Sequence, residues 1–123
     1  MFRISVEHSF AAAHCLRIEG HKCESLHGHN WIVTVTVQGK NLDQYGMLMD
    51  FHDLKAIVAP IVERLDHVFL NSVPPFDSIN PTTEQICRYI SDEVARRLPE
   101  GVSVYSVKTS ESQRCCGEYL PGE

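Results

Sequence analysis

A short stretch near the N-terminus gathers residue types that bind metal ions: Cys23 is followed by His27 and His29, with Gly28 between the two histidines. Residues two apart in a strand point to the same face, so the two imidazoles would lie side by side. His14 ends an alternating pattern in the preceding segment and would come next to them if the two segments pair as a hairpin. Three neutral imidazoles suit zinc and leave its fourth position open for water or substrate. The sequence therefore predicts a catalytic zinc site formed by His14, His27 and His29.

Other interpretations of these residues stay open. A single histidine on a strand is more often a surface or packed residue than a ligand, although Cys23 just upstream favours a metal site. A structural zinc with Cys23 as fourth ligand is the main rival, but such sites are usually rich in thiolates, often in a paired Cys-x-x-Cys spacing that this sequence lacks. Because imidazole also binds other divalent ions, the residue types leave the identity of the metal open.

The composition is that of a single globular domain spanning residues 1–123, with 43% hydrophobic and 22% charged residues. A formal net charge of -5 argues against a nucleic-acid partner. No run of about 20 apolar residues is present that would span a membrane. The first ten residues lack the apolar block of a signal peptide, so we expect a cytoplasmic protein.

Four segments are predicted to be strands. Residues 2–12 alternate between apolar and polar side chains, and residues 27–38 contain a run of β-branched side chains. Residues 102–111 and 116–120 are predicted to form the third and fourth strands. Two antiparallel hairpins of this kind would form a four-stranded antiparallel sheet.

Two segments between the hairpins are predicted to be helices. Apolar residues recur at helical spacing over residues 50–67, where Asp53 can cap the start and Pro60 should kink or shorten the helix. Thr82 and Gln85 form a capping box at the start of the second helix. Two helices on one face of the sheet make an α+β domain.

Further motifs make nearly the whole chain similar to the family of 6-pyruvoyltetrahydropterin synthases and 6-carboxytetrahydropterin synthases. Cys23 and the His-Gly-His triplet resemble the family's Cys-x-x-x-His-Gly-His motif. Glu111, eight residues before Tyr119, matches the family's pterin-binding glutamate, with Glu118 as a weaker competitor. The other matching segments are 10–14, 46–55, 65–71 and 80–84.

The resemblance implies a fold and an assembly. Members of the family have the tunnelling fold (T-fold), in which subunits join their sheets into a barrel. They form homohexamers of two stacked trimers, with active sites between subunits. Barrel closure between chains would also remove the two exposed edges of a small sheet.

The resemblance also implies an activity. The spacing between Cys23 and the His-Gly-His triplet is that of the 6-carboxytetrahydropterin synthases, lyases of queuosine and deazapurine biosynthesis. They convert 7,8-dihydroneopterin triphosphate into 6-carboxy-5,6,7,8-tetrahydropterin. Zinc would act as a Lewis acid and Cys23, as a thiolate, as general base. Asp66 and His67 would supply a second proton-handling group, and Glu111 would bind the pterin N–H groups.

Alternatives accompany this assignment. Glu24 resembles the glutamate with which a related subgroup makes 6-hydroxymethyl-7,8-dihydropterin for folate, so a bifunctional or 6-pyruvoyltetrahydropterin synthase-like enzyme is one alternative. From the residues alone, Asp66 and His67 are more simply the end of a helix. Because adjacent residues seldom bond each other, we expect any contact between these two to cross subunits or to run through Cys23. A non-enzymatic, zinc-stabilised binding domain is the alternative from another class.

Overall fold

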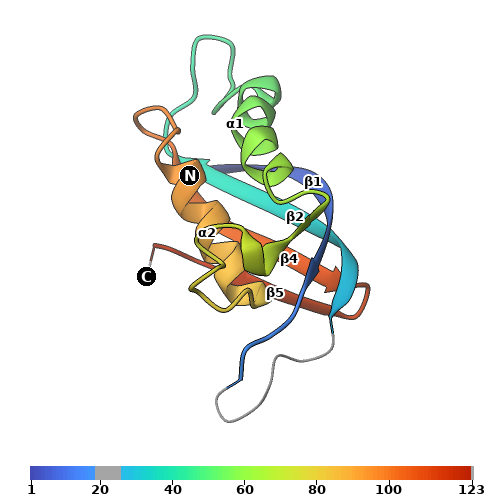
Figure 1. Cartoon of the computed structure of the whole chain (residues 1–123). Helices are drawn as coiled ribbons and strands as arrows, with labels where there is room; N and C mark the ends of the chain where they lie inside the picture. The colour runs from blue at the N-terminus through green and yellow to red at the C-terminus, as the bar shows by residue number, and fades with distance from the viewer. Residues whose placement is uncertain (19–25, 123) are drawn as a thin grey trace.

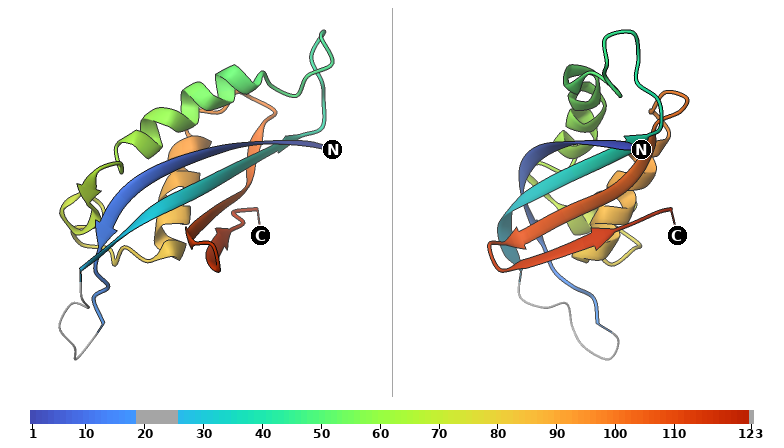
Figure 2. Two further views of the ribbon diagram at one scale, coloured as in Figure 1. Left: turned by 90° about the vertical axis from the view of Figure 1, so that its right-hand side faces the viewer. Right: turned by 180° about the vertical axis from the view of Figure 1, so that it is seen from behind.

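The computed structural model describes residues 1–18 and 26–122. They form one curved sheet with two α-helices packed on a single face, which is a two-layer α+β structure (Figures 1 and 2). The α+β class predicted from the sequence is therefore confirmed. In chain order the elements are β1 (Phe2–His14), β2 (His27–Gly39), α1 (Phe51–Glu63), β3 (Val68–Phe69), the 3-10 helix η1 (Leu70–Ser72), α2 (Thr83–Ala95), β4 (Ser103–Ser112) and β5 (Cys115–Tyr119).

The sheet is built around the hairpin of β1 and β2. These strands pair antiparallel along their whole length, from Phe2 opposite Gly39 to His14 opposite His27. β4 pairs antiparallel with β2, and β5 pairs antiparallel with β4. The side chains that alternate toward the helices are the more buried ones on both central strands, as the sequence pattern predicts. The four strands expected from the sequence are all present.

The sheet has a fifth strand that the sequence analysis missed. β3 runs parallel to β1, with Ala12 opposite Val68 and Ala13 opposite Phe69, and the strand order is β3-β1-β2-β4-β5. The expectation of a four-stranded antiparallel sheet is therefore wrong in this respect, because the observed sheet is five-stranded and mixed. A strand of two residues is too short to show the alternation by which strands are recognised in a sequence.

The two helices begin at side-chain caps. Asp50, and not Asp53, caps α1, because its carboxylate accepts a hydrogen bond from the His52 amide at 2.7 Å. Pro60 lies inside α1, and the helix ends shortly after it. Thr82 Oγ1 caps α2 as predicted, accepting from the Gln85 amide at 3.1 Å. Neither these helices nor η1, within the described part of the chain, is long and apolar enough to cross a membrane.

Candidate metal centre and active site

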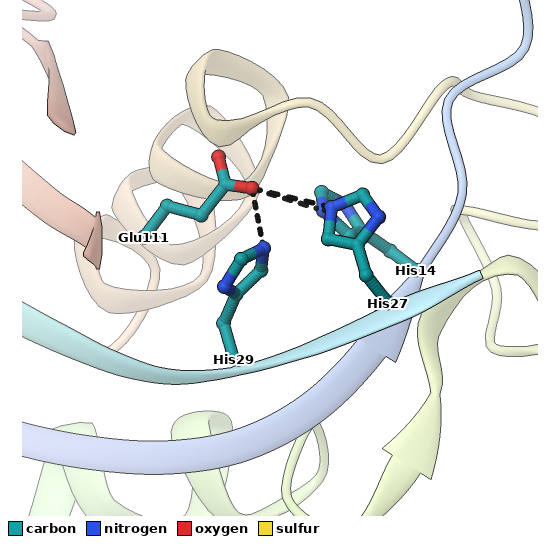
Figure 3. Close-up of side chains that lie close together, drawn as sticks. All are labelled: His14, His27, His29 and Glu111. Carbon is teal, nitrogen blue, oxygen red and sulfur yellow. Dashed lines mark hydrogen bonds and ion pairs between the residues drawn. The ribbon is translucent and has the colours of Figure 1, made fainter. Parts of the chain in front are cut away.

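Three histidines meet at one end of the sheet, on the face that the helices cover. His14 lies opposite His27 in the β1–β2 register, and His29 lies opposite Ala12. The indole of Trp31 packs edge-on against two of the rings, with its centroid 4.9 Å from that of His14 and 5.5 Å from that of His29. The pairing of two strands thus brings the three imidazoles together (Figure 3).

The Nε2 atoms of the histidines and one oxygen of Glu111 form a compact set of donors. His14 Nε2 lies 3.0 Å from His27 Nε2. Glu111 Oε1 is 3.4 Å from each of these two atoms and 2.7 Å from His29 Nε2. All four atoms lie within 4.8 Å of one another. Figure 3 shows one carboxylate oxygen of Glu111 pointing at all three histidines, and because Glu111 lies on β4, strands β1, β2 and β4 all contribute to the cluster.

His14 is the most buried member of the cluster, with 1% of its side chain exposed. Its Nδ1 lies 2.8 Å from the carbonyl oxygen of Pro81. A hydrogen bond to that carbonyl places the ring proton on Nδ1 and leaves the lone pair on Nε2, which faces the other donors. A second nitrogen held in this way is typical of metal-binding histidines. The sequence analysis did not identify Pro81, because every residue has a carbonyl and its use leaves no pattern.

The second oxygen of Glu111 contacts the start of α2. Thr83 Oγ1 donates a hydrogen bond to Glu111 Oε2 at 3.3 Å. Residue 117 on β5 is a glycine, and a Cβ there would lie 3.0 Å from Thr83 Cγ2, so a side chain would crowd this approach. The N-terminus of α2 adds a favourable potential beside the carboxylate. Glu111 is thus held between the histidines and Thr83, whose contact the sequence analysis missed.

Burial and charge shift the pKa values of two groups in the cluster. Burial is the main cause that lowers the pKa of His29; the attraction of Glu111 opposes it, and the nearby His27 and His14 add to the lowering. Burial raises the pKa of Glu111, but the attraction of His29 and His14 outweighs this effect and lowers the pKa overall. Neutral imidazole and ionised carboxylate are the protonation states that bind a cation.

The donors fit a divalent cation. Tetrahedral zinc ligands with bonds of about 2.0–2.1 Å lie roughly 3.3 Å apart. The four separations given above run from 2.7 to 3.4 Å, and all donor pairs lie within 4.8 Å. Within the described residues, the buried His29 Nε2 has no hydrogen-bond partner of acceptable geometry, although Glu111 Oε1 is close. A cation would supply the missing partner. His14, His27 and His29 can hold it, with Glu111 or a bound molecule in fourth place.

Asp66 and His67 form a separate pair at the outer edge of β1. Asp66 Oδ1 accepts a hydrogen bond from the Ala11 amide at 2.8 Å, and Asp66 Oδ2 lies 2.9 Å from His67 Nδ1. His67 has a φ of 57°, and its amide donates to the Ala11 carbonyl at 2.6 Å. The expectation that these adjacent residues do not bond each other is wrong. The left-handed backbone at His67 folds the imidazole back onto the carboxylate.

The position of this pair leaves the histidine open to its surroundings. The His67 side chain is 81% exposed and borders a shallow pocket of about 440 Å³, lined by residues 11–13, 28–30 and 67–69. The contact with Asp66 favours the proton on Nδ1 and leaves Nε2 as an acceptor. Because α1 ends at Glu63, the pair does not form the last turn of that helix. The pKa of Asp66 is lowered, first by the hydrogen bond from Ala11, with burial opposing and His67 adding to the effect.

The other predicted site residues divide into two groups. Cys23 and Glu24 lie outside the described residues. Glu118 is exposed on β5, opposite Lys108 of β4, and is not part of the donor cluster. Of the two glutamates considered from the sequence, Glu111 is therefore the one beside the histidines.

Comparisons with known proteins identify the family of this chain. Residues 3–121 match the family model described as 6-pyruvoyl tetrahydropterin synthase. The chain is 41% identical over 111 residues to an Archaeoglobus fulgidus protein provisionally named 6-carboxy-5,6,7,8-tetrahydropterin synthase, covering 89% of this chain and 88% of the relative. It is 40% identical over 102 residues to a dihydroneopterin monophosphate aldolase of Pyrococcus furiosus, covering 83% and 82%.

The fold is also that of a solved structure. A 6-pyruvoyl tetrahydropterin synthase from Caenorhabditis elegans superposes with a TM-score of 0.85 at 23% identity, covering 98% of this chain and 96% of the other. At this identity the likeness concerns the fold. The assignment to a family rests on two other findings. The family model spans nearly the whole chain, and two relatives are at least 40% identical to it. This chain therefore belongs to the 6-pyruvoyl tetrahydropterin synthase family.

Proposed function

We propose that the chain is a zinc-dependent lyase that converts 7,8-dihydroneopterin triphosphate into 6-carboxy-5,6,7,8-tetrahydropterin for queuosine biosynthesis. The observation that carries this proposal is the convergence of His14, His27 and His29 through their Nε2 atoms, with Glu111 beside them. A set of three neutral imidazoles suits zinc. The name of the Archaeoglobus fulgidus relative supports the choice of product. The reaction would remove the triphosphate and release acetaldehyde.

Zinc in this position would supply a Lewis acid for the side-chain oxygens of the substrate. The fourth coordination position is available to substrate only if Glu111 is not a permanent ligand. We propose that Glu111 binds the pterin ring instead, since a carboxylate can accept two N–H donors at once. Thr83 already orients the Oε2 atom, and the contacts of Oε1 with the histidines would give way to substrate N–H groups.

Proton transfer in this proposal depends on residues outside the donor cluster. Cys23 would be the general base, because a thiol near a cation is partly ionised at neutral pH. The second group would be His67, oriented by Asp66. Since the His67 side chain is largely exposed and only its Nδ1 contacts Asp66, we propose that it acts in an active site shared with a neighbouring subunit.

A homohexamer of two stacked trimers in the cytoplasm is the assembly we propose. Among the described residues, the outer side of β1 pairs with another strand only at Ala12 and Ala13, which leaves most of a 13-residue strand available to a second chain. Light scattering during size-exclusion chromatography tests this assembly. A particle of about six times the chain mass is expected, and a 13.9 kDa monomer at micromolar concentration would contradict it.

A different product is favoured by one specific observation. The Pyrococcus furiosus relative is named an aldolase that acts on dihydroneopterin monophosphate, and its identity to this chain is similar to that of the Archaeoglobus fulgidus relative. Glu24, next to Cys23, would be a second base that redirects which carbon–carbon bond breaks. The enzyme would then make 6-hydroxymethyl-7,8-dihydropterin for folate, alone or in addition to the carboxy product. A 6-pyruvoyltetrahydropterin synthase-like enzyme, which would eliminate the triphosphate without breaking a carbon–carbon bond, is a separate alternative.

The product assay separates these candidates. Purified protein loaded with zinc is incubated with 7,8-dihydroneopterin triphosphate, and the pterin products are identified by mass spectrometry. We expect 6-carboxytetrahydropterin, and we expect none from protein stripped of metal with a chelator. Glu24→Gln should leave this product unchanged. Formation of 6-hydroxymethyl-7,8-dihydropterin alone, and its loss in Glu24→Gln, would instead assign the folate reaction.

A zinc-stabilised domain without enzymatic activity is the alternative from another class. Cys23→Ala separates it from the enzyme. A catalytic Cys23 predicts that zinc content and melting temperature stay near those of the unchanged protein while turnover is lost. A structural ligand at this position predicts that metal and stability fall together.

A further inference from the structure

The main-chain groups that follow β1 are paired by two asparagine side chains. The Cys15 amide donates to Asn71 Oδ1 at 3.0 Å, and Asn71 Nδ2 donates to the Cys15 carbonyl at 2.8 Å. Two residues later, the Arg17 amide donates to Asn80 Oδ1 at 2.7 Å, and Asn80 Nδ2 donates to the Arg17 carbonyl at 3.0 Å. A carboxamide offers the same donor and acceptor as a peptide group. Asn71 and Asn80, which we call the asparagine clamp, therefore act as a neighbouring strand would.

The segment that supplies the clamp is tied to the same stretch of chain by Arg17. Its guanidinium donates to the carbonyls of Ile79 and Asn71, both at 3.3 Å, and to that of Phe76 at 2.9 Å. Residues 71–80 and the stretch that follows β1 are thus joined by hydrogen bonds to both its main chain and its Arg17 side chain. Their relative position is fixed more firmly than that of an ordinary surface loop.

The clamp encloses the contact that orients His14. On one side, His14 directly precedes Cys15, which Asn71 holds. On the other side, Asn80 directly precedes Pro81, whose carbonyl oxygen lies 2.8 Å from His14 Nδ1. One partner of this hydrogen bond is therefore next to a residue that the clamp holds, and the other is next to a residue of the clamp itself. A small shift of either one would turn the His14 ring or remove the partner of Nδ1, and Nε2 would lose its direction.

We propose that Asn71 and Asn80 are positioning residues that hold His14 in the tautomer and orientation required of a metal ligand, an inference that rests on the proposed metal site. Neither asparagine belongs to the donor cluster, and neither is charged. Their effect on the metal is therefore geometric and passes through His14. A clamp that only stabilises the fold would lower the melting temperature and leave metal affinity unchanged.

The test uses metal binding by the full chain. Metal-free protein is titrated with Co²⁺, whose visible absorption reports the geometry of its ligands, and zinc affinity is measured by competition with a chelator. Asn80→Ala removes both clamp bonds to Arg17, whereas Asn80→Asp keeps the acceptor and loses the donor. Asn41→Ala, at an exposed loop position, is the control.

We expect Asn80→Ala to weaken zinc binding about tenfold or more and to change the Co²⁺ spectrum. Asn80→Asp should have a smaller effect, and Asn41→Ala none.

A double-mutant cycle with His14→Ala tests the route of the effect. If the clamp acts through His14, adding Asn80→Ala to His14→Ala should change the remaining affinity by less than about twofold. A tenfold loss in that background would overturn the inference, as would wild-type affinity and spectrum in Asn80→Ala with only a lower melting temperature. If Asn80→Ala does not fold, Asn80→Asp takes its place: weaker zinc binding with a changed Co²⁺ spectrum supports the inference, and wild-type affinity and spectrum overturn it. Failure of the unchanged protein to bind Co²⁺ or zinc would overturn the proposed function itself, and this inference with it.

Discussion

The histidine cluster and the Asp66–His67 pair are held in place in different ways. His14, the most buried ligand candidate, lies on a long paired strand, with 1% of its side chain exposed. His67 lies in a short left-handed turn at the sheet edge, with 81% of its side chain exposed. The cluster takes its geometry from the hydrogen-bond ladder of the sheet, whereas the pair depends on a few bonds to the backbone of Ala11.

This difference matches the two roles proposed for these regions. A metal site needs donors fixed to within a fraction of an ångström, which paired strands provide. A proton-handling group that serves a neighbouring subunit needs an imidazole that projects from the surface. We therefore expect substitutions in the cluster to change metal binding, and substitutions in the pair to leave it unchanged.

Removing one ligand is expected to have the largest effect. His29→Ala should weaken zinc binding by more than the ten- to hundredfold that loss of an outer-shell partner produces. His67→Ala should bind zinc as the unchanged protein does but turn over more slowly. His52→Ala, at an exposed position in the first turn of α1, is the matched control. Chelator competition measures the zinc affinity of all three variants, and steady-state kinetics measures their turnover. Equal loss of zinc in His29→Ala and His67→Ala would contradict the proposed difference between the two regions.

Within the cluster, Glu111→Gln separates the proposed pterin anchor from the proposed metal ligands. As a pterin anchor, Glu111 contributes hydrogen bonds to a charged group, which are worth about 1.5–3 kcal/mol each, so the KM should rise roughly ten- to hundredfold. Zinc affinity should change by less than about twofold. Steady-state kinetics and metal titration on the same preparation measure the two quantities. A large loss of zinc with little change in KM would identify Glu111 as a fourth ligand and the site as a closed one.

Thr83 tests how Glu111 is oriented, and the expected effect is smaller. Its hydrogen bond to Glu111 is 3.3 Å long and partly exposed, so we estimate about 1 kcal/mol or less, which is up to about fivefold in KM. Thr83→Val keeps the shape and loses the hydroxyl, whereas Thr83→Ser keeps the hydroxyl. The KM should rise in the first variant and stay near its original value in the second. Similar values in both would show that the hydroxyl does not matter.

The sequence predicts the part of this site that depends on strand alternation. His27 and His29 share a face because they are two residues apart, and pairing of the two predicted strands places His14 next to them. The three histidine donors of the cluster follow from these positions. Glu111 could be assigned to the predicted third strand, but its proximity to the histidines depends on the side-chain conformation, which the pattern does not contain.

The features that could not be predicted depend on backbone groups or on unusual backbone angles. Pro81 contributes a carbonyl oxygen, which any residue could supply. The asparagine clamp joins segments more than 50 residues apart, and isolated asparagines in a loop are ordinary turn residues. The direct Asp66–His67 bond requires a positive φ at a histidine, which is uncommon for any residue other than glycine.

Asp66 gives the smallest predicted effect, and it depends on pH. Its pKa is lowered in the folded chain, chiefly by the Ala11 amide, so its ionised form stabilises the fold. That contribution is complete above the unfolded value of about 3.9 and is lost as the pH falls through the lower folded value. Asp66→Asn removes it, so its melting temperature should lie slightly below that of the unchanged protein at pH 6. The difference should shrink toward pH 3. His67→Ala should keep most of this dependence because the Ala11 bond remains, whereas complete loss in His67→Ala would make the imidazole the main partner of Asp66.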